Sequence, residues 1–136
     1  MDEALLDTDI LSEVLKRKDR RVLATARQYL AQHQRLAFSA ITVYEIIRGL
    51  KANRAARQLA GFLKTVGTSD VFPVSLPILM RAAELWADGR KLGHPHDDAD
   101  LIIAATALEH GRVLVTGNVG HFVWITGLTV EDWRQP

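Results

Sequence analysis

Short apolar runs alternate with longer amphipathic stretches along this chain of 136 residues. In the longer stretches the apolar residues recur at helical spacing, and capping or turn residues bound them. This pattern predicts helices over residues 10–16, 20–33, 42–53, 54–66, 77–91 and 97–110. The short runs predict strands over residues 4–6, 36–39, 71–74 and 112–116, with a last edge strand over residues 126–130.

The alternation of strands and helices determines the predicted fold class. Strands that are separated by long helical stretches run parallel, because each helix carries the chain back across the sheet. We therefore predict an α/β fold with three layers, α/β/α, around a short, mainly parallel central sheet of four to five strands. In such sheets, ligands bind outside the carboxyl ends of the strands, where the strand order reverses.

Composition restricts the class of protein further. The length predicts one domain over residues 1–136, and 48% hydrophobic with 24% charged residues is typical of a globular protein. A net charge of +1 provides no overall basic field, so any nucleic acid must be bound locally. The absence of cysteine excludes disulfides and thiolate zinc sites. Without a signal peptide or an apolar span, we expect a cytoplasmic protein that is not associated with a membrane.

Acid and amide side chains recur at positions where predicted strands end or predicted helices begin. Asp7 follows the first strand, Glu45 the second and Asn118 the fourth, and residues 97–100 open a helix. The carboxyl ends of parallel strands meet at one edge, so these groups should converge there. Clustered carboxylates repel one another unless a cation neutralises them, and Mg²⁺ or Mn²⁺ prefers oxygen ligands. The pattern therefore predicts a metal site at this edge.

The spacing of the aspartates at residues 97–100 also carries information. Residues three apart share a helix face, so Asp97 and Asp100 can point together whereas Asp98 points elsewhere. The following residues 101–108 are apolar on nearly all sides, which predicts a buried helix. A carboxylate that leads a buried helix towards a cleft is a candidate metal ligand.

Each polar residue also has a structural interpretation, in which it hydrogen-bonds the end of a helix or a turn. In that interpretation Asp7 and Asp9 are helix N-caps, Thr42 and Glu45 form a capping box, Asp97 and Asp98 favour a helix dipole, and Asn118 is a turn residue. Capping alone does not explain why these positions all lie at the same edge.

The histidines and tryptophans favour structural roles. The five histidines are scattered, and Pro95 interrupts His94 and His96, so zinc is not favoured. His33 and His110 lie at predicted helix ends, where histidine suits the dipole. His121 follows Asn118 closely enough to remain a candidate. The tryptophans, Trp86, Trp124 and Trp133, are interpreted as core or edge packing rather than as base-stacking platforms.

Four segments together resemble the PIN-domain ribonucleases, in particular the VapC toxins of bacterial toxin–antitoxin pairs. These segments are residues 5–12, 39–49, 100–107 and 115–122, and the resemblance covers nearly the whole chain, including residues 127–130. It implies a single PIN-like nuclease domain over residues 1–136.

The resemblance also implies roles for individual residues. Asp7 matches the first metal-binding aspartate, Glu45 the helix glutamate and Asp100 the aspartate that opens the buried helix. Asn118 falls where the family often has a fourth acid; an amide ligates more weakly, and Asp97 could partly compensate. The implied catalytic residues are thus Asp7, Glu45, Asp100 and Asn118.

The activity implied by the family is hydrolysis of RNA phosphodiesters with Mg²⁺ or Mn²⁺. Further candidate contacts, each with an equal structural interpretation, are Thr8, Ser39, Thr116 and Arg48. The implied partners are the RNA substrate and a VapB-like antitoxin that inserts an Arg or Lys into the acidic cleft. We also expect a homodimer, because the helices between Val43 and Val66 carry more apolar residues than one sheet face needs.

Two other functions compete with this hypothesis. The first is a PIN-fold module that holds a partner without catalysis. The second is an aspartyl-nucleophile phosphatase, since residues 5–9 resemble the strand end of the haloacid dehalogenase-like family. Leu11 stands where that motif usually has threonine, and no lysine motif follows.

Overall fold

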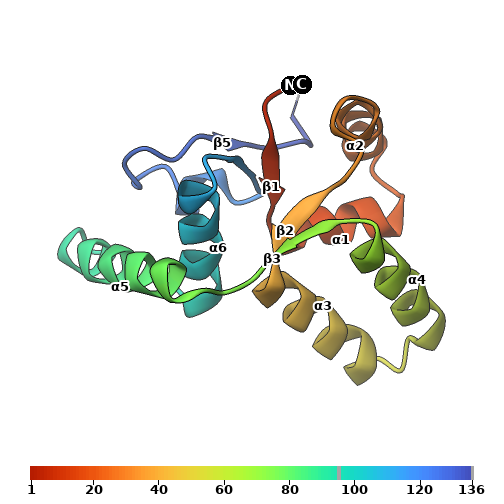
Figure 1. The fold of residues 1–136 in the computed structure, drawn as a ribbon, viewed down its shortest axis with the longest axis horizontal. Helices are drawn as coiled ribbons and strands as arrows, with labels where there is room; N and C mark the ends of the chain where they lie inside the picture. The colour runs from red at the N-terminus through yellow and green to blue at the C-terminus, as the bar shows by residue number, and fades with distance from the viewer. Residues whose placement is uncertain (95, 136) are drawn as a thin grey trace.

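The structure is a computed structural model that describes residues 1–94 and 96–135 (Figure 1). Strands and helices alternate along it as the hydrophobic pattern predicts. In chain order the elements are β1 (Ala4–Leu6), α1 (Thr8–Lys16), α2 (Arg20–His33), β2 (Ala37–Ser39), α3 (Ala40–Ala52), α4 (Ala56–Gly67), β3 (Asp70–Phe72), α5 (Leu76–Lys91), α6 (Asp98–Glu109), β4 (Val113–Val115), the 3₁₀ helix η1 (Val119–His121) and β5 (Val130–Glu131).

The described strands pair in parallel in two ladders. One ladder has the order β1-β4-β5, and the other pairs β2 with β3. Since β1 also packs against β2, the strands follow the spatial order β3, β2, β1, β4, β5. From β1 the chain moves outwards to β3 and then crosses to β4 on the other side of β1. The strand order therefore reverses between β1 and β4, which is where such sheets bind ligands.

Both faces of the strands are covered, so the predicted three layers are confirmed. In β1, Ala4 and Leu6 pack in a core with residues of α1, α2, α3 and α4, whereas Leu5 packs in a second core with α5 and α6. In β4, Val115 packs in the first of these cores and Leu114 in the second. Figure 1 shows α5 and α6 on one side of the strands and α1, α2 and α4 on the other. The burial of α6 on nearly all sides also confirms the apolar pattern of residues 101–108.

Several predicted boundaries differ from the structure, three of them for identifiable reasons. The strand predicted over residues 126–130 is reduced to Val130–Glu131, because Thr126 and Gly127 form a turn in which Gly127 has a φ of +84°. The third strand ends at Phe72, before Pro73, which has no N–H to donate to a ladder. The helix predicted from Arg54 begins only at Ala56, because Arg54 has a φ of +53°, which is outside the right-handed helical region. Within residues 1–94 and 96–135, no helix is long and apolar enough to cross a membrane.

Candidate active site

Asp7 lies at the point where the strand order reverses. It follows β1 directly and caps α1, because its Oδ1 accepts a hydrogen bond of 2.7 Å from the backbone N of Thr8. Its Oδ2 accepts a hydrogen bond of 2.7 Å from Oγ1 of Thr116, the residue that follows β4. The capping role expected of Asp7 is therefore confirmed, and the same carboxyl group also joins the ends of β1 and β4.

Asp7 is an unusual cap because it is buried, with 5% of its surface exposed. Burial raises the pKa of its carboxyl group from 3.8 to about 7, and the charges of Asp9 and Asp100 contribute to the rise. The hydrogen bonds from Thr116 and Thr8 act in the opposite direction and do not offset it. A cap on an exposed helix end needs no such burial, so the position favours an additional role for Asp7.

Asp100 enters the same region from the first turn of α6. It is half-buried, and burial followed by the charge of Asp97 raises its pKa from 3.8 to about 6. Glu45 and Asp9 raise this pKa further, while His121 lowers it. Asp97 itself is exposed and caps α6, since its Oδ1 accepts a hydrogen bond of 3.0 Å from the backbone N of Asp100. The structural interpretation of Asp97 is thus confirmed.

The capping box proposed for Glu45 is wrong. Ser39 caps α3 by accepting a hydrogen bond from the N of Ile41, so Thr42 and Glu45 both lie inside the helix. The Oε1 atom of Glu45 instead accepts a hydrogen bond of 2.7 Å from Oγ1 of Thr8, which also lies 3.0 Å from Oγ1 of Thr42. Glu45 is therefore linked to the residue next to Asp7 and has no capping role to explain its position.

Asn118 occupies a more open position than the acids. It is exposed and precedes η1, and its backbone N donates a hydrogen bond of 3.0 Å to Oγ1 of Thr116. Its side chain makes no capping hydrogen bond to η1. The predicted link between residue 118 and the site therefore runs, in this structure, through its backbone and Thr116.

The C-terminal segment closes one side of this region. Asp9 lies within α1 and is not its cap, which corrects one structural interpretation. Its Oδ2 accepts a hydrogen bond of 3.0 Å from the N of Gly117, whose O accepts one of 2.7 Å from Arg134. A Cβ atom on residue 117 would lie against the Arg134 guanidinium and the Asp9 carboxyl group, so the ends of these two side chains would have to move to accept it.

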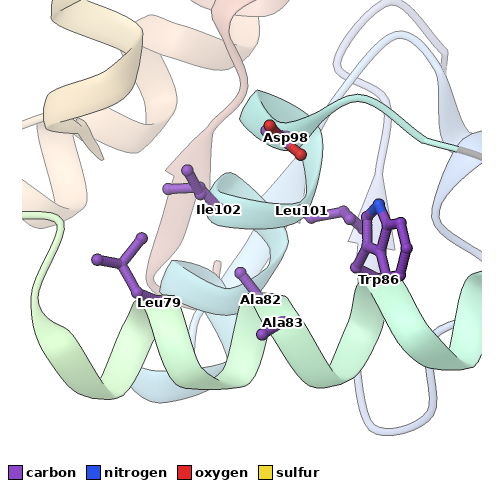
Figure 2. Close-up of a pocket in the computed structure, with 7 residues that line it drawn as sticks. All are labelled: Leu79, Ala82, Ala83, Trp86, Asp98, Leu101 and Ile102. Atoms are coloured by element: carbon purple, nitrogen blue, oxygen red, sulfur yellow. The ribbon is translucent and has the colours of Figure 1, made fainter.

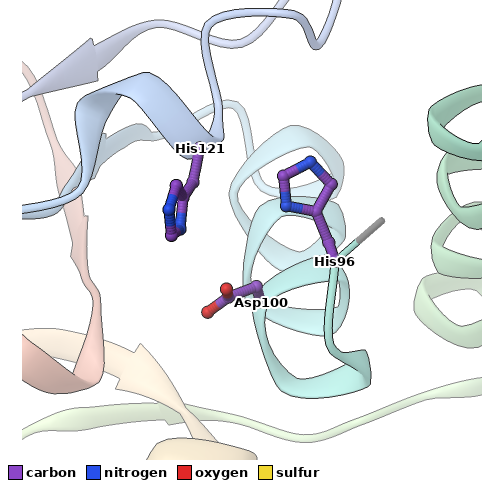
Figure 3. A group of neighbouring side chains, drawn as sticks. All are labelled: His96, Asp100 and His121. Atoms are coloured by element: carbon purple, nitrogen blue, oxygen red, sulfur yellow. The ribbon is translucent and has the colours of Figure 1, made fainter. Parts of the chain in front are cut away.

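The structure also assembles a group that the sequence interpretation missed. One ligand atom each from His96, Asp100 and His121 lie within 4.8 Å of one another (Figure 3). Among residues 1–94 and 96–135, these three form the group of His and acidic residues whose ligand atoms lie this close together. The group contains Asp100 but neither Asp7 nor Glu45. Two signals were available in the sequence: His96 precedes Asp100 by four residues, and His121 follows Asn118 by three.

A separate apolar groove of about 460 Å³ lies between α5 and α6, and its lining does not include Asp7 (Figure 2). Of the predicted core or edge packing, Trp86 on α5 has an edge position, since it is 46% exposed beside the groove, whereas Trp133 is 3% exposed in the core. The lining residues are Leu79, Ala82, Ala83, Trp86, Asp98, Leu101 and Ile102.

Comparison with known proteins agrees with this architecture. The chain belongs to the PIN-domain family, whose model matches residues 4–122. Within that family, the similarity is to VapC ribonucleases. Ribonuclease VapC1 of Haemophilus influenzae is 33% identical over 134 residues, which cover 96% of this chain and 98% of that protein. The tRNA(fMet)-specific endonuclease VapC of Shigella flexneri is 29% identical and covers 95% and 96% of the two chains.

Solved structures show the same fold over nearly the whole chain. DNA-bound VapBC from Salmonella typhimurium contains a chain with 27% identity and a TM-score of 0.85, which covers 98% of this chain and 99% of that chain. FitAcB from Neisseria gonorrhoeae contains one with 23% identity and a TM-score of 0.83, covering 98% and 99%, which supports the fold alone.

Proposed function

We propose that this protein is an Mg²⁺- or Mn²⁺-dependent endoribonuclease and the toxin of a toxin–antitoxin pair. The names of its VapC relatives support the activity and the class of substrate. The single observation that carries the proposal is the burial of Asp7 at the reversal of strand order, within electrostatic reach of Asp100. The charge of Glu45 also raises the pKa of Asp100, so Glu45 lies within electrostatic reach of Asp100 as well.

The residues present fit a hard divalent ion. All donors in the group Asp7, Glu45 and Asp100 are carboxylate oxygens, which Mg²⁺ and Mn²⁺ prefer. Each oxygen of Asp7 accepts one hydrogen bond and keeps lone-pair capacity for a further partner. Burial raises the pKa of Asp7 and Asp100, and a bound cation would favour their ionised forms.

The position of each residue indicates the role that it would have in holding the ion and in catalysis. Asp7 and Asp100 would hold the principal ion, and Glu45 would complete its shell or orient the attacking water. When bound, the ion would activate water and stabilise charge on the phosphate oxygens. Thr8 and Thr116 would keep Glu45 and Asp7 in place through the hydrogen bonds described above. Asn118 and Asp97 would be weaker, additional ligands.

The proposed partners are an RNA substrate and a VapB-like antitoxin. Solved structures of similar chains are described as VapBC or toxin–antitoxin complexes, and two of them as DNA-bound VapBC. We also propose a homodimer. The exposed apolar residues that would support it are more numerous on α5, with Leu76, Leu79, Met80 and Trp86, than on α3 and α4, with Tyr44 and Leu63.

The direct test is cleavage of structured RNA by the purified protein in the presence of Mg²⁺ or Mn²⁺. We expect Asp7→Asn and Asp100→Asn to abolish cleavage, and EDTA to do the same. Asp98→Asn is a matched control, because Asp98 lies on the same turn of α6 but is exposed on its groove side. Cleavage that survives both substitutions and EDTA would contradict a metal mechanism.

The same assay separates the competing functions. RNA binding without cleavage under any metal would favour a module that only holds a partner. Release of phosphate from a generic monoester, with the RNA left intact, would favour the aspartyl phosphatase.

A further inference from the structure

His96, Asp100 and His121 come from three different parts of the chain. His96 precedes α6, Asp100 lies in the first turn of α6, and His121 ends η1. Figure 3 shows the imidazole rings of His96 and His121 flanking the Asp100 carboxyl group. No turn or cap of the backbone requires this meeting of two imidazoles and a carboxylate.

Trp124 holds both histidines in this arrangement. Its Nε1 donates a hydrogen bond of 2.8 Å to the backbone O of His121. Its ring stacks on the His96 ring with 5.1 Å between centroids and 12° between planes. The indole ring in turn rests on Gly89 of α5, where a Cβ atom would lie 3.1 Å from Trp124 and 2.8 Å from the backbone O of His94. The histidines are thus positioned by packing that is independent of Asp7.

The two ring nitrogens of His96 have different surroundings. Its Nε2 atom is buried and has no hydrogen-bond partner among the residues that the structure describes. Figure 3 shows the other ring nitrogen, Nδ1, on the side of the ring that faces Asp100 and His121. An imidazole nitrogen beside a second imidazole and a carboxylate is a ready ligand for a borderline-soft cation.

We infer that His96, Asp100 and His121 form a binding site for a divalent transition-metal ion such as Zn²⁺. Two nitrogen donors and one oxygen donor match Zn²⁺, whereas Mg²⁺ prefers oxygen donors alone. Ligand atoms of a tetrahedral zinc ion are about 3.4 Å apart. Atoms that already lie within 4.8 Å of one another reach that spacing through small side-chain rotations.

This site shares Asp100 with the site proposed for Mg²⁺, but its existence does not rest on the proposed nuclease function. Only the expected effect on cleavage rests on that function. An ion held by both histidines would also use the Asp100 carboxyl group, on which the Mg²⁺ site depends. We therefore expect Zn²⁺ to inhibit Mg²⁺-dependent cleavage at concentrations at which it occupies the histidine site.

The test measures Zn²⁺ binding directly, without RNA. Untagged protein is titrated with Zn²⁺ by calorimetry in the absence of Mg²⁺, which would compete for Asp100, and with Co²⁺ by visible absorption, which reports ligand geometry. We expect one Zn²⁺ per chain. His121→Ala and His96→Ala should each weaken Zn²⁺ binding at least about tenfold. Even the loss of a residue that only hydrogen-bonds to a metal ligand typically lowers metal affinity by about 10- to 100-fold. His121 is exposed, so its replacement leaves the core intact.

Two control variants make the result decisive. His110→Ala removes a histidine that stacks on Phe72 beyond the other end of α6 and should bind Zn²⁺ like the wild type. Asp7→Asn should lose Mg²⁺-dependent cleavage yet keep Zn²⁺ binding, which separates failure of the two proposals. Absence of Zn²⁺ binding by the wild type, or equal binding by the wild type and both histidine variants, would overturn the inference.

Discussion

Replacing Asp7 by Asn should remove activity and, in the absence of metal, stabilise the protein at alkaline pH. Asp7 is 5% exposed, and burial raises its pKa from 3.8 to about 7. Asparagine has the same shape without the charge. Its amide oxygen can accept from Thr8 N, and its amide nitrogen can donate to Oγ1 of Thr116, which then accepts instead of donating. The substitution therefore removes mainly the cost of burying an ionised carboxylate.

The pH interval follows from the two pKa values of Asp7. Below pH 3.8 its carboxyl group is protonated in both states, so its contribution to stability is fully present. As the pH rises the unfolded chain ionises first, while the folded protein keeps the proton until about pH 7, and the free energy of unfolding falls throughout this interval. At about 1.36 kcal/mol per pH unit, the whole loss is about 4 kcal/mol, of which about 2.5 kcal/mol falls between pH 5 and pH 8.

The measurement is urea denaturation of the wild type and of Asp7→Asn, in EDTA, at several pH values. We expect the free energy of unfolding of the wild type to fall by about 2.5 kcal/mol more than that of the variant between pH 5 and pH 8. Groups that titrate in both proteins cancel in this comparison. Adding Mg²⁺ at pH 8 should restore the wild type, by about 2.7 kcal/mol at a hundredfold excess over its Kd, and leave the variant unchanged. Parallel pH curves for the two proteins would refute the reasoning.

Three further substitutions test the surroundings of Asp7 and of the histidine site. Thr116→Val removes the hydrogen bond that lowers the pKa of Asp7, so metal binding should require a higher pH and the free energy of unfolding should fall by about 1–2 kcal/mol, measured by denaturation across pH. Glu45→Gln keeps a partner for Thr8 but removes the charge; RNA cleavage should fall at least about tenfold with little change in thermal stability. Gly89→Ala forces a Cβ atom against His94 O and the Trp124 ring, which should cost about 1–3 kcal/mol and weaken Zn²⁺ binding, measured by melting and calorimetry.

The fold was accessible from the sequence because its signals are local. Apolar runs of three or four residues between amphipathic stretches are sufficient to indicate parallel strands with helical crossovers. The position of Asp7 follows from the same pattern, since it comes directly after the first apolar run. That the apolar helix at residues 101–108 is buried also follows from its composition, because it has no polar face.

What escaped prediction depends on packing between distant segments. Ser39 and Thr42 both provide a capping side chain, and the end of β2 decides in favour of Ser39, which changes the role of Glu45. The meeting of His96 with His121 requires Trp124 to rest on Gly89 of α5, a contact that no local pattern encodes. The last strand is short because of the turn at Gly127, whose left-handed backbone breaks the extended run.

The separation of the strands into two ladders leaves no ladder hydrogen bond between β1 and β2. Asp7 follows β1 in one ladder and Glu45 follows β2 in the other, so the two residues are held together by the packing of β1 against β2 and by the hydrogen bonds of Thr8 with Glu45 and Thr42. A protein that binds α3 and α4 would therefore act on the position of Glu45 relative to Asp7 through packing and side-chain contacts alone. Hydrogen exchange at the amides of β2 and α3, compared with those of β1 and β4, would show whether the two ladders differ in local stability.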